Sequence, residues 1–291
     1  KTAVDSELQV NENDTQIHIK GREFAYTIDR RTALFTEMKF AGREYLNHPM
    51  ELNIWRAPTD NDMYIKAEWK KAHYDKAYTR AYTTEVVQGK HGVKIVSHAS
   101  VVAETVQKIL DVTITWKIDA SGKIDADIEA TKDGEFPDLP RFGVRMFLDK
   151  KLSDARYFGM GPQESYRDKH QAASHGLYRA NVGDLHEDYI RPQENGSHYD
   201  CEYVELNNSR YGIVASAEKA FSFNASYYTQ EELEKKTHNY ELIESDSVVF
   251  CVDYALNGIG SNSCGPVVLE QYRFDDVLFR FQFTLMPYVK G

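Results

Sequence analysis

Residues 124–130 read Ile124-Asp-Ala-Asp-Ile-Glu-Ala130, a strict alternation of apolar and charged side chains. Successive side chains of a β-strand point to opposite faces of a sheet, so this period of two predicts a strand with one buried and one wet face. A wet face is typical of antiparallel sheets, because parallel sheets are usually covered on both sides. Residues 124–131 are therefore predicted to form an antiparallel strand.

Similar short runs, alternating or rich in β-branched residues, lie on both sides of this stretch and are separated by turn signals such as Gly21, Gly122 and Gly134. Strands are predicted at residues 15–20, 23–29, 83–88, 93–99, 110–118, 141–148, 204–206, 212–216, 247–252 and 278–285. Only two short helices are predicted, at 68–78 and at 231–236 behind a capping box that begins at Thr229. The fold class is therefore all-β, a large antiparallel sandwich forming a single domain over residues 15–291.

Composition excludes several classes of protein. The chain has 291 residues and a formal net charge of −10, and no basic stripe that would bind nucleic acid is present in the sequence. No stretch approaches the roughly 20 apolar residues that span a membrane. Three scattered cysteines favour a reducing compartment, so a cytoplasmic location is expected, with a periplasmic one left open. The polar residues 1–14 are predicted to be a linker from a missing upstream region.

Four irregular segments, at 55–62, 158–175, 189–199 and 257–266, are long for a compact domain and rich in aromatic, amide and glycine residues. Such loops usually carry function. In the first, Trp55 offers a flat apolar face, and Arg56 is predicted to brace the loop through a buried ion pair with Asp60. Asp60 and Asp62 resemble the start of a calcium loop, but the third ligand and the glycine are missing, so no metal site is predicted.

The other loops supply further candidates. Glu164 is either a catalytic carboxylate or, as favoured here, an ion-pair partner of Arg167. The segment 189–199 concentrates guanidinium, carboxylate and amide groups, which bind sugar hydroxyls well. Its candidates are Arg191, Glu194, Asn195 and His198, the last being either a base or a hydrogen-bonded structural histidine. In the fourth loop Cys264 is more readily interpreted as a small residue than as a nucleophile, because no basic residue lies near it in sequence.

Five motifs, in this order, resemble the C-terminal domain (the small chain, or domain 5) of bacterial β-galactosidases of glycoside hydrolase family 2. They are WRAPTDND at 55–62, LPRFG at 139–143, YFGMGPQESYRD at 157–168, YIRPQENGSH at 189–198 and NGIGSNSCGP at 257–266. The resemblance covers nearly the whole chain. It implies a single β-supersandwich similar to galactose mutarotase, in agreement with the all-β prediction.

The resemblance also implies that the catalytic residues lie outside this chain. In that family the two catalytic glutamates and the magnesium ligands belong to an upstream (β/α)₈ barrel, so this segment is expected to be non-catalytic and inactive alone. The intact enzyme is expected to hydrolyse terminal β-D-galactosides such as lactose with retention, to bind magnesium and sodium, and to form a homo-oligomer. The expected partners of the segment are the catalytic barrel and the galactoside.

The family also suggests a role for the last loop. There a tryptophan after a Gly-x-Gly stretch stacks on the sugar at the aglycone position, and alignment through residues 258–260 places Cys264 at that position. Asn262, Ser263 and Cys264 are therefore expected near the aglycone site, without the stacking ring. Two alternatives stay open: a stand-alone aldose 1-epimerase using Glu164 or Glu194 with His170 or His198, and a carbohydrate-binding module.

Overall fold

The computed structural model describes residues 8–105 and 108–290, and almost all of its regular structure is strand. The strands are β1 (Gln9–Glu12), β2 (Gln16–Lys20), β3 (Phe24–Asp29), β4 (Leu34–Phe40), β5 (Arg43–Glu44), β6 (Leu46–Asn53), β7 (Tyr78–Gln88), β8 (Gly92–Val102), β9 (Leu110–Asp119), β10 (Ile124–Lys132), β11 (Arg141–Asp149), β12 (Asp154–Gly161), β13 (Ser174–Asn181), β14 (Ser197–Asn207), β15 (Tyr211–Ser226), β16 (Ser247–Leu256) and β17 (Leu278–Val289). The helices are α1 (Ile65–Lys71) and α2 (Gln230–Lys235), with short 3₁₀ turns η1 (Asp60–Asp62), η2 (Tyr74–Lys76), η3 (Val182–Leu185), η4 (Asn239–Glu241) and η5 (Glu270–Tyr272).

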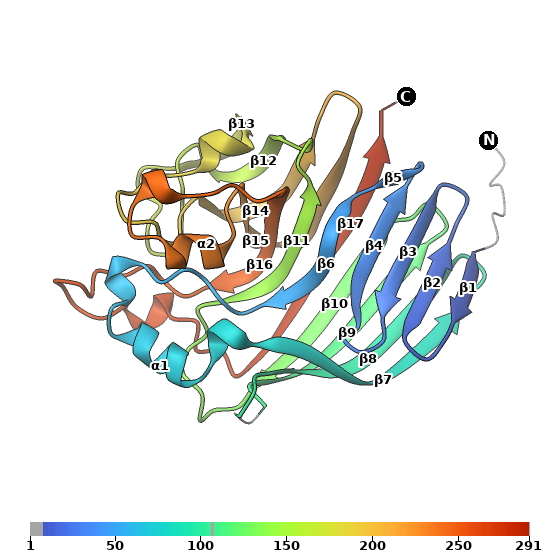
Figure 1. Ribbon diagram of the computed structural model, residues 1–291, viewed down its shortest axis with the longest axis horizontal. Coiled ribbons are helices and arrows are strands. Elements are labelled where there is room, and N and C mark those ends of the chain that lie inside the picture. Colours follow the sequence, from blue (N-terminus) through green and yellow to red (C-terminus); the bar gives the residue numbers. More distant parts are fainter. Residues whose placement is uncertain (1–7, 106–107, 291) are drawn as a thin grey trace.

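The strands form two antiparallel sheets, so the all-β, antiparallel prediction is confirmed. A five-stranded sheet runs β1-β2-β3-β4-β5, and a twelve-stranded sheet follows the path β13-β12-β14-β15-β17-β10-β9-β8-β7, with β6, β11 and β16 attached off that path. In Figure 1 the smaller sheet lies in front of β7 to β10. Phe35 of β4 packs edge-on against Trp116 of β9, with 4.9 Å between ring centroids, and the Trp116 indole N–H donates to the Ala33 carbonyl at 2.8 Å. The apolar core therefore lies between the two layers.

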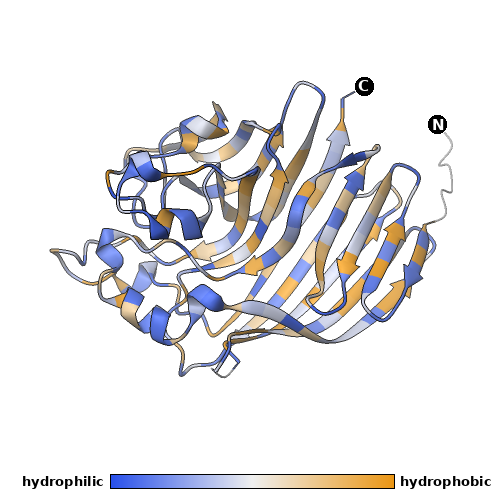
Figure 2. Cartoon of the chain, viewed as in Figure 1, coloured by the Kyte–Doolittle hydropathy of each residue, from blue (hydrophilic) through white to orange (hydrophobic). Residues whose placement is uncertain are grey.

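Strand β10 shows how the alternating sequence builds this core. Ile124, Ala126, Ile128 and Ala130 are buried, whereas the intervening acidic residues are partly or fully exposed. Strand β10 is paired with β9 on one side and β17 on the other, and Ile128 lies opposite Ile114 and Phe281. Figure 2 shows the resulting alternation of hydrophobic and hydrophilic residues along the strands. The period of two thus determined which face of the sheet is buried.

Both predicted helices exist, with shifted bounds. The Thr229 hydroxyl accepts a hydrogen bond from the Glu232 backbone N–H at 3.1 Å, so the predicted cap is present and α2 begins at Gln230. The predicted helix over 68–78 is wrong in its extent, because α1 ends at Lys71 and Tyr78 already begins β7. His73 adopts the left-handed conformation, with φ of 58°, which interrupts the helix before η2.

The predicted linker differs from the structure where the two overlap. Gln9–Glu12 forms β1, which is paired with β2, and Val10 lies opposite Ile19 and packs against the core. Leu8 is buried as well. Residues 8–12 therefore pack as part of the smaller sheet, because Leu8 and Val10 contact the core and β1 pairs with β2. The remaining part of the predicted linker, residues 1–7, lies outside the described residues.

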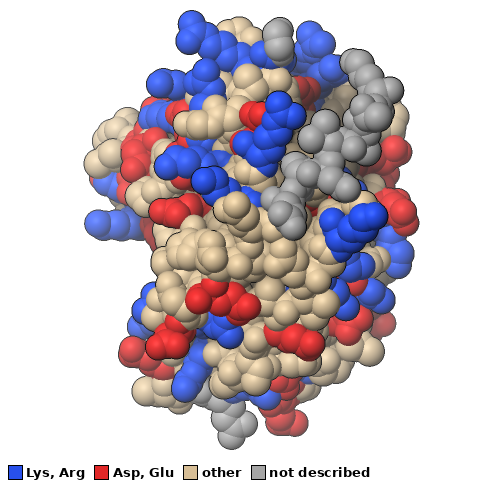
Figure 3. Space-filling model, turned by 90° about the vertical axis from the view of Figure 1, so that its right-hand side faces the viewer, with Lys and Arg blue, Asp and Glu red and all other residues tan. Residues whose placement is uncertain are grey.

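On the face that Figure 3 shows, acidic and basic side chains both occur among uncharged residues, and Lys and Arg are more numerous in its upper half. None of the helices in the described part of the chain is both long and apolar enough to cross a bilayer.

Candidate functional site

The four long segments of the sequence come together at one end of the molecule, at the left of Figure 1. Arg56 joins two of them, since its guanidinium donates to the carbonyl oxygens of Asn257 at 2.6 Å and Gly258 at 3.2 Å. The Glu194 backbone N–H donates to the Ala57 carbonyl at 3.0 Å and so attaches the 189–199 loop to the 55–62 loop. Loops far apart in sequence therefore form one connected surface.

Arg56 forms a buried ion pair, but with Asp62 rather than with the predicted Asp60. Its Nη2 lies 2.8 Å from Asp62 Oδ1 and its Nε lies 3.2 Å from Asp62 Oδ2, and both side chains are almost fully buried. The turn η1 directs Asp62 inward, where its carboxylate also accepts from the Thr59 backbone N–H at 2.9 Å. Asp60 is exposed and contacts only the Gln193 amide. The prediction that Arg56 braces the loop through a buried ion pair is confirmed, but its partner is Asp62 and not Asp60.

Trp55 is also a structural residue in this structure. It is only 3% exposed, packs edge-on against Trp69 at 6.1 Å, and donates from its indole N–H to Glu234 at 3.1 Å. The flat apolar face that the sequence suggested is therefore covered by protein.

The 257–266 loop has a firmly held base and an exposed tip. The Asp168 carboxylate accepts from the backbone N–H groups of Ile259 at 2.9 Å and Gly260 at 2.7 Å. Asn61 donates to the Gly260 carbonyl at 2.5 Å and accepts from the Ser263 hydroxyl at 2.8 Å. Gly260 has a φ of +67°, a conformation that favours glycine. The base of the loop is thus tied to two other loops.

At the tip, Ser263 and Cys264 are exposed and Asn262 is half-buried. Sequence reasoning missed Asp168 and Asn61 as the residues that hold this loop. Both lie inside the quoted motifs, at the end of YFGMGPQESYRD and within WRAPTDND, which was the signal available. The motifs do not show that these two side chains contact the same loop. Asp168 binds a residue about 90 positions later in the sequence, and Asn61 binds one about 200 positions later.

Glu164 forms an ion pair with Lys169, not with Arg167 as predicted. Its carboxylate also accepts from the Tyr189 hydroxyl and from the Gly196 backbone N–H at 2.8 Å. Arg167 points elsewhere and donates to the Arg273 carbonyl at 2.7 Å. Glu164 therefore anchors the 189–199 loop, and the ion-pair interpretation holds with a different partner.

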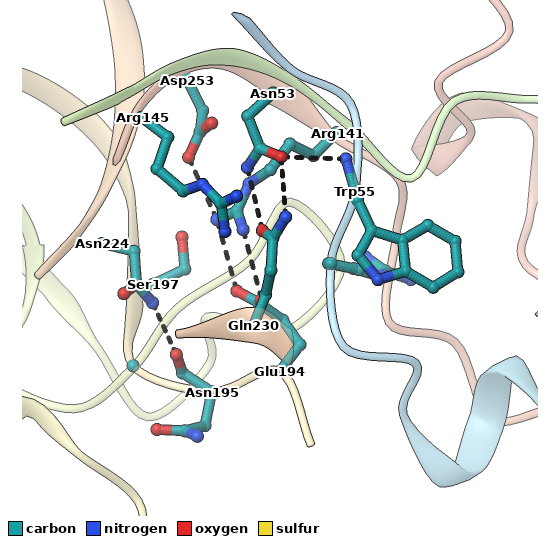
Figure 4. Close-up of polar contacts among 12 residues, drawn as sticks. Asn53, Trp55, Arg141, Arg145, Glu194, Asn195, Ser197, Asn224, Gln230 and Asp253 are labelled. Carbon is teal, nitrogen blue, oxygen red and sulfur yellow. Dashed lines mark hydrogen bonds and ion pairs between the residues drawn. The ribbon is translucent and has the colours of Figure 1, made fainter. Parts of the chain in front are cut away.

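A buried polar cluster lies behind the loops and is shown in Figure 4. Arg141, from the LPRFG motif, lies 3.3 Å from Glu194 and 3.1 Å from Asp253, and all three side chains are buried. Burial raises the pKa of Asp253 to about 7 and also raises the pKa of Glu194. One guanidinium thus faces two carboxylates inside the fold, an arrangement that braces the loop rather than presents an acid to a ligand.

Asn195 also stabilises the conformation of the 189–199 loop. Asn195 accepts from the Glu187 backbone N–H at 3.0 Å and donates to the Gln193 carbonyl at 2.9 Å. The backbone carbonyl oxygen of Asn195 accepts a hydrogen bond from the Asn224 side-chain amide at 2.6 Å, as Figure 4 shows. Arg191 is exposed and belongs to none of the ion pairs found among the described residues.

His198 is a buried neutral histidine. It is 1% exposed and lies against the rings of Tyr157 and Phe223. Its Nδ1 lies 3.1 Å from the Met160 carbonyl, which assigns the ring proton to that nitrogen. Burial lowers the pKa of His198 to about 4. Since Glu194 and His198 are both buried, they are not placed to exchange protons with a bound sugar.

The described strands and loops define a protein of the galactose mutarotase-like all-β class. The fold is similar to that of a galactose 1-epimerase from Lactobacillus acidophilus NCFM, with a TM-score of 0.52 and 9% sequence identity, covering 99% of this chain and 100% of that one. At this identity the likeness concerns the fold alone, and it confirms the predicted fold class.

Sequence comparison identifies the family. Residues 20–285 match the family described as the β-galactosidase small chain. The chain is 44% identical over 281 residues to a β-galactosidase of Actinobacillus pleuropneumoniae and 32% identical over 282 residues to one of Staphylococcus xylosus; each match covers 97% of this chain and 28% of the relative. The chain therefore belongs to the β-galactosidase small chain family, as the motifs predicted. It spans about 28% of the length of these relatives.

Proposed function

We propose that this chain is the non-catalytic part of a β-galactosidase, that it associates with a catalytic portion of the longer protein, and that its 257–266 loop completes the sugar site. The observation that carries the proposal is the family match over residues 20–285, in relatives of which this chain spans 28%. The intact protein is then proposed to hydrolyse terminal β-D-galactosides such as lactose with retention.

The construction of the loop supports this role. Its base is held by Arg56 and Asn61 of the 55–62 loop and by Asp168 of the 158–175 loop, so the tip is positioned by two other loops. A site held within narrow limits by supporting contacts is what binding requires. The exposed tip carries Ser263 and Cys264, small residues that a neighbouring domain or a sugar can approach closely. Asn262, Ser263 and Cys264 are proposed to lie at the aglycone side of the site.

Exposed apolar side chains beside these loops support association with the catalytic portion. Met63 and Tyr64 follow η1, and Val267 and Leu269 follow the 257–266 loop; all four are exposed. Asn61 ties these two loops together. A group of exposed apolar side chains is typical of surfaces that bind another protein or domain. We assign this end of the molecule to the contact with the catalytic portion.

Other properties of the intact protein are part of the same proposal. A homo-oligomer, a cytoplasmic location, and bound magnesium and sodium follow from the family resemblance and the composition. Among the described residues, no group of three or more His, Cys, Asp or Glu side chains is arranged to hold a metal ion. None of them is therefore assigned to those ions.

The proposal is tested with Cys264→Trp in the full-length protein, with Cys264→Ala as the matched control. A stacking ring adds about 1 kcal/mol of contact with a sugar face, so the KM for lactose is expected to fall about fivefold. The KM for a nitrophenyl β-galactoside is expected to change little, and the alanine variant is expected to behave as the wild type. The Cys264 thiol should react with a thiol reagent faster in the 291-residue chain than in the full-length protein.

Two further results would contradict the proposal. One is an unchanged KM for lactose together with equal reactivity of the thiol in both forms, which would place the loop away from the site. The other is hydrolysis of nitrophenyl β-galactoside by the 291-residue chain purified from a host lacking its own β-galactosidase, which would make this segment catalytic.

A further inference from the structure

A cleft lies along β6, and its lining includes Trp55 at the start of the 55–62 segment. It has a volume of about 500 Å³ and is bounded by β6, the starts of β4, β7 and α2, and Arg145 of β11. Figure 1 shows α2 on one side of β6 and the start of β7 on the other. Its lining includes no residue of the 158–175, 189–199 or 257–266 segments. The volume falls in the range of roughly 300–1,000 Å³ that small-molecule sites occupy.

The wall of this cleft carries carboxylates with free acceptor capacity. Arg145, which is 8% exposed, donates to Glu51 at 2.6 and 2.9 Å and to Glu231 with two bonds of 2.9 Å. The two carboxylates remain about half exposed, at 45% and 55%. Both bonds to Glu51 end on Oε2, so Oε1 keeps its lone pairs for a ligand. The arginine therefore fixes the two carboxylates without saturating them.

Planar amides lie beside this ion-pair group. Asn53 and Gln230 are buried and pair through their amides at 3.0 Å, and Figure 4 shows the pair between Arg145 and Trp55. At the cleft, Tyr78 is 50% exposed and offers a ring at the first residue of β7. Fixed carboxylate acceptors and an exposed aromatic ring that line the same cleft are suited to a ligand with hydroxyl groups and a weakly apolar face.

The charged residues that line the cleft indicate which ligand charge it favours. Four acidic residues (Asp29, Glu51, Asp75 and Glu231) line the cleft against two basic ones (Lys76 and Arg145), which disfavours anions. Each of the four carboxylates already contacts a cation: Arg31, Lys70 or Arg145. The acidic groups therefore do not require a cationic ligand for charge balance. A neutral ligand rich in hydroxyl groups fits best.

We infer that this cleft is a binding site for a neutral mono- or disaccharide, separate from the 257–266 loop and belonging to this chain alone. The carboxylate of Glu51 accepts from sugar hydroxyls, and the Tyr78 ring packs against a sugar face. The inference does not depend on the proposed function, because binding requires no catalytic portion.

The test is calorimetric titration of the folded 291-residue chain with galactose, glucose, lactose and maltose. Saturable binding of at least one of these sugars is expected. Glu51→Ala should raise the Kd about tenfold, because it removes a charged hydrogen-bond acceptor. Tyr78→Ala should raise the Kd about fivefold by removing the stacking ring. Glu129→Gln, at an exposed position of β10, is the matched control and should leave the Kd unchanged.

Both cleft positions are about half exposed, so the variants should retain the fold, which circular dichroism and a cooperative melt would confirm. Glu51→Gln serves as a second, isosteric variant and should also weaken binding. The inference is overturned if the folded chain shows no saturable binding of any of the four sugars, or if binding is unaffected by the cleft variants. Tighter binding of glucose 1-phosphate or glucosamine than of glucose would overturn the neutral ligand class.

Discussion

Replacing Arg56 by alanine should remove the connection on which the loop cluster depends. The guanidinium is fully buried and makes four hydrogen bonds, two to Asp62 and one each to the carbonyls of Asn257 and Gly258. Its loss leaves a buried carboxylate without its counter-charge, which by itself costs about 3–5 kcal/mol. The free energy of unfolding, measured by urea denaturation of the 291-residue chain, should fall by at least this amount.

Matched variants distinguish the contribution of the planar guanidinium geometry from that of the positive charge. Arg56→Lys keeps the charge, but an ammonium cannot reproduce the planar fork, so a loss of about 2 kcal/mol is expected. Arg280→Ala removes an exposed arginine from its pair with Asp127 and should cost far less, because solvent screens a surface ion pair. Asp62→Asn should destabilise strongly, whereas Asp60→Asn should cost little because Asp60 is exposed. Equal effects of Arg56→Ala and Arg280→Ala would refute the bracing role.

Two further predictions concern buried titratable groups. Burial raises the pKa of Asp253 to about 7, so between about pH 4 and 7 the folded chain retains a proton that the unfolded chain has lost, and stability from this group falls as the pH rises. Asp253→Asn should therefore gain stability relative to the wild type across this window and level off above it; a relative loss with rising pH would contradict the assignment. Burial lowers the pKa of His198 to about 4, so its contribution to stability is present above about pH 6.5 and lost as the pH falls towards 4. Its imidazole NMR resonances should not titrate between pH 5 and 8, and a midpoint near 6.5 would show that the ring is exposed.

Sequence reasoning succeeded where the signal is local. The alternation at 124–130 predicted which side chains of β10 are buried, and the Thr229 capping box predicted the start of α2. It failed at β1, β4, β5, β6, β12 and β13, which were not predicted. Among these, β6 contains Pro49, a residue that argues against a strand, and all eight residues of β13 are exposed or only partly buried. Such strands owe their conformation to the neighbours with which they pair, and a single strand's own residues do not reveal that pairing.

The sequence by itself determined the all-β class, the family and the four segments that gather at one end, because periodicity, turn residues and motifs are properties of contiguous residues. Only the tertiary structure decided which carboxylate faces which cation, since Asp62 rather than Asp60, and Lys169 rather than Arg167, complete the ion pairs. It also decided that Glu194 and His198 are buried, and that Glu51, Tyr78 and Glu231, far apart in the chain, line one cleft. The physical reason is that charge pairing and burial depend on how each loop folds and on which elements pack against it, and neither is set by the order of residues alone.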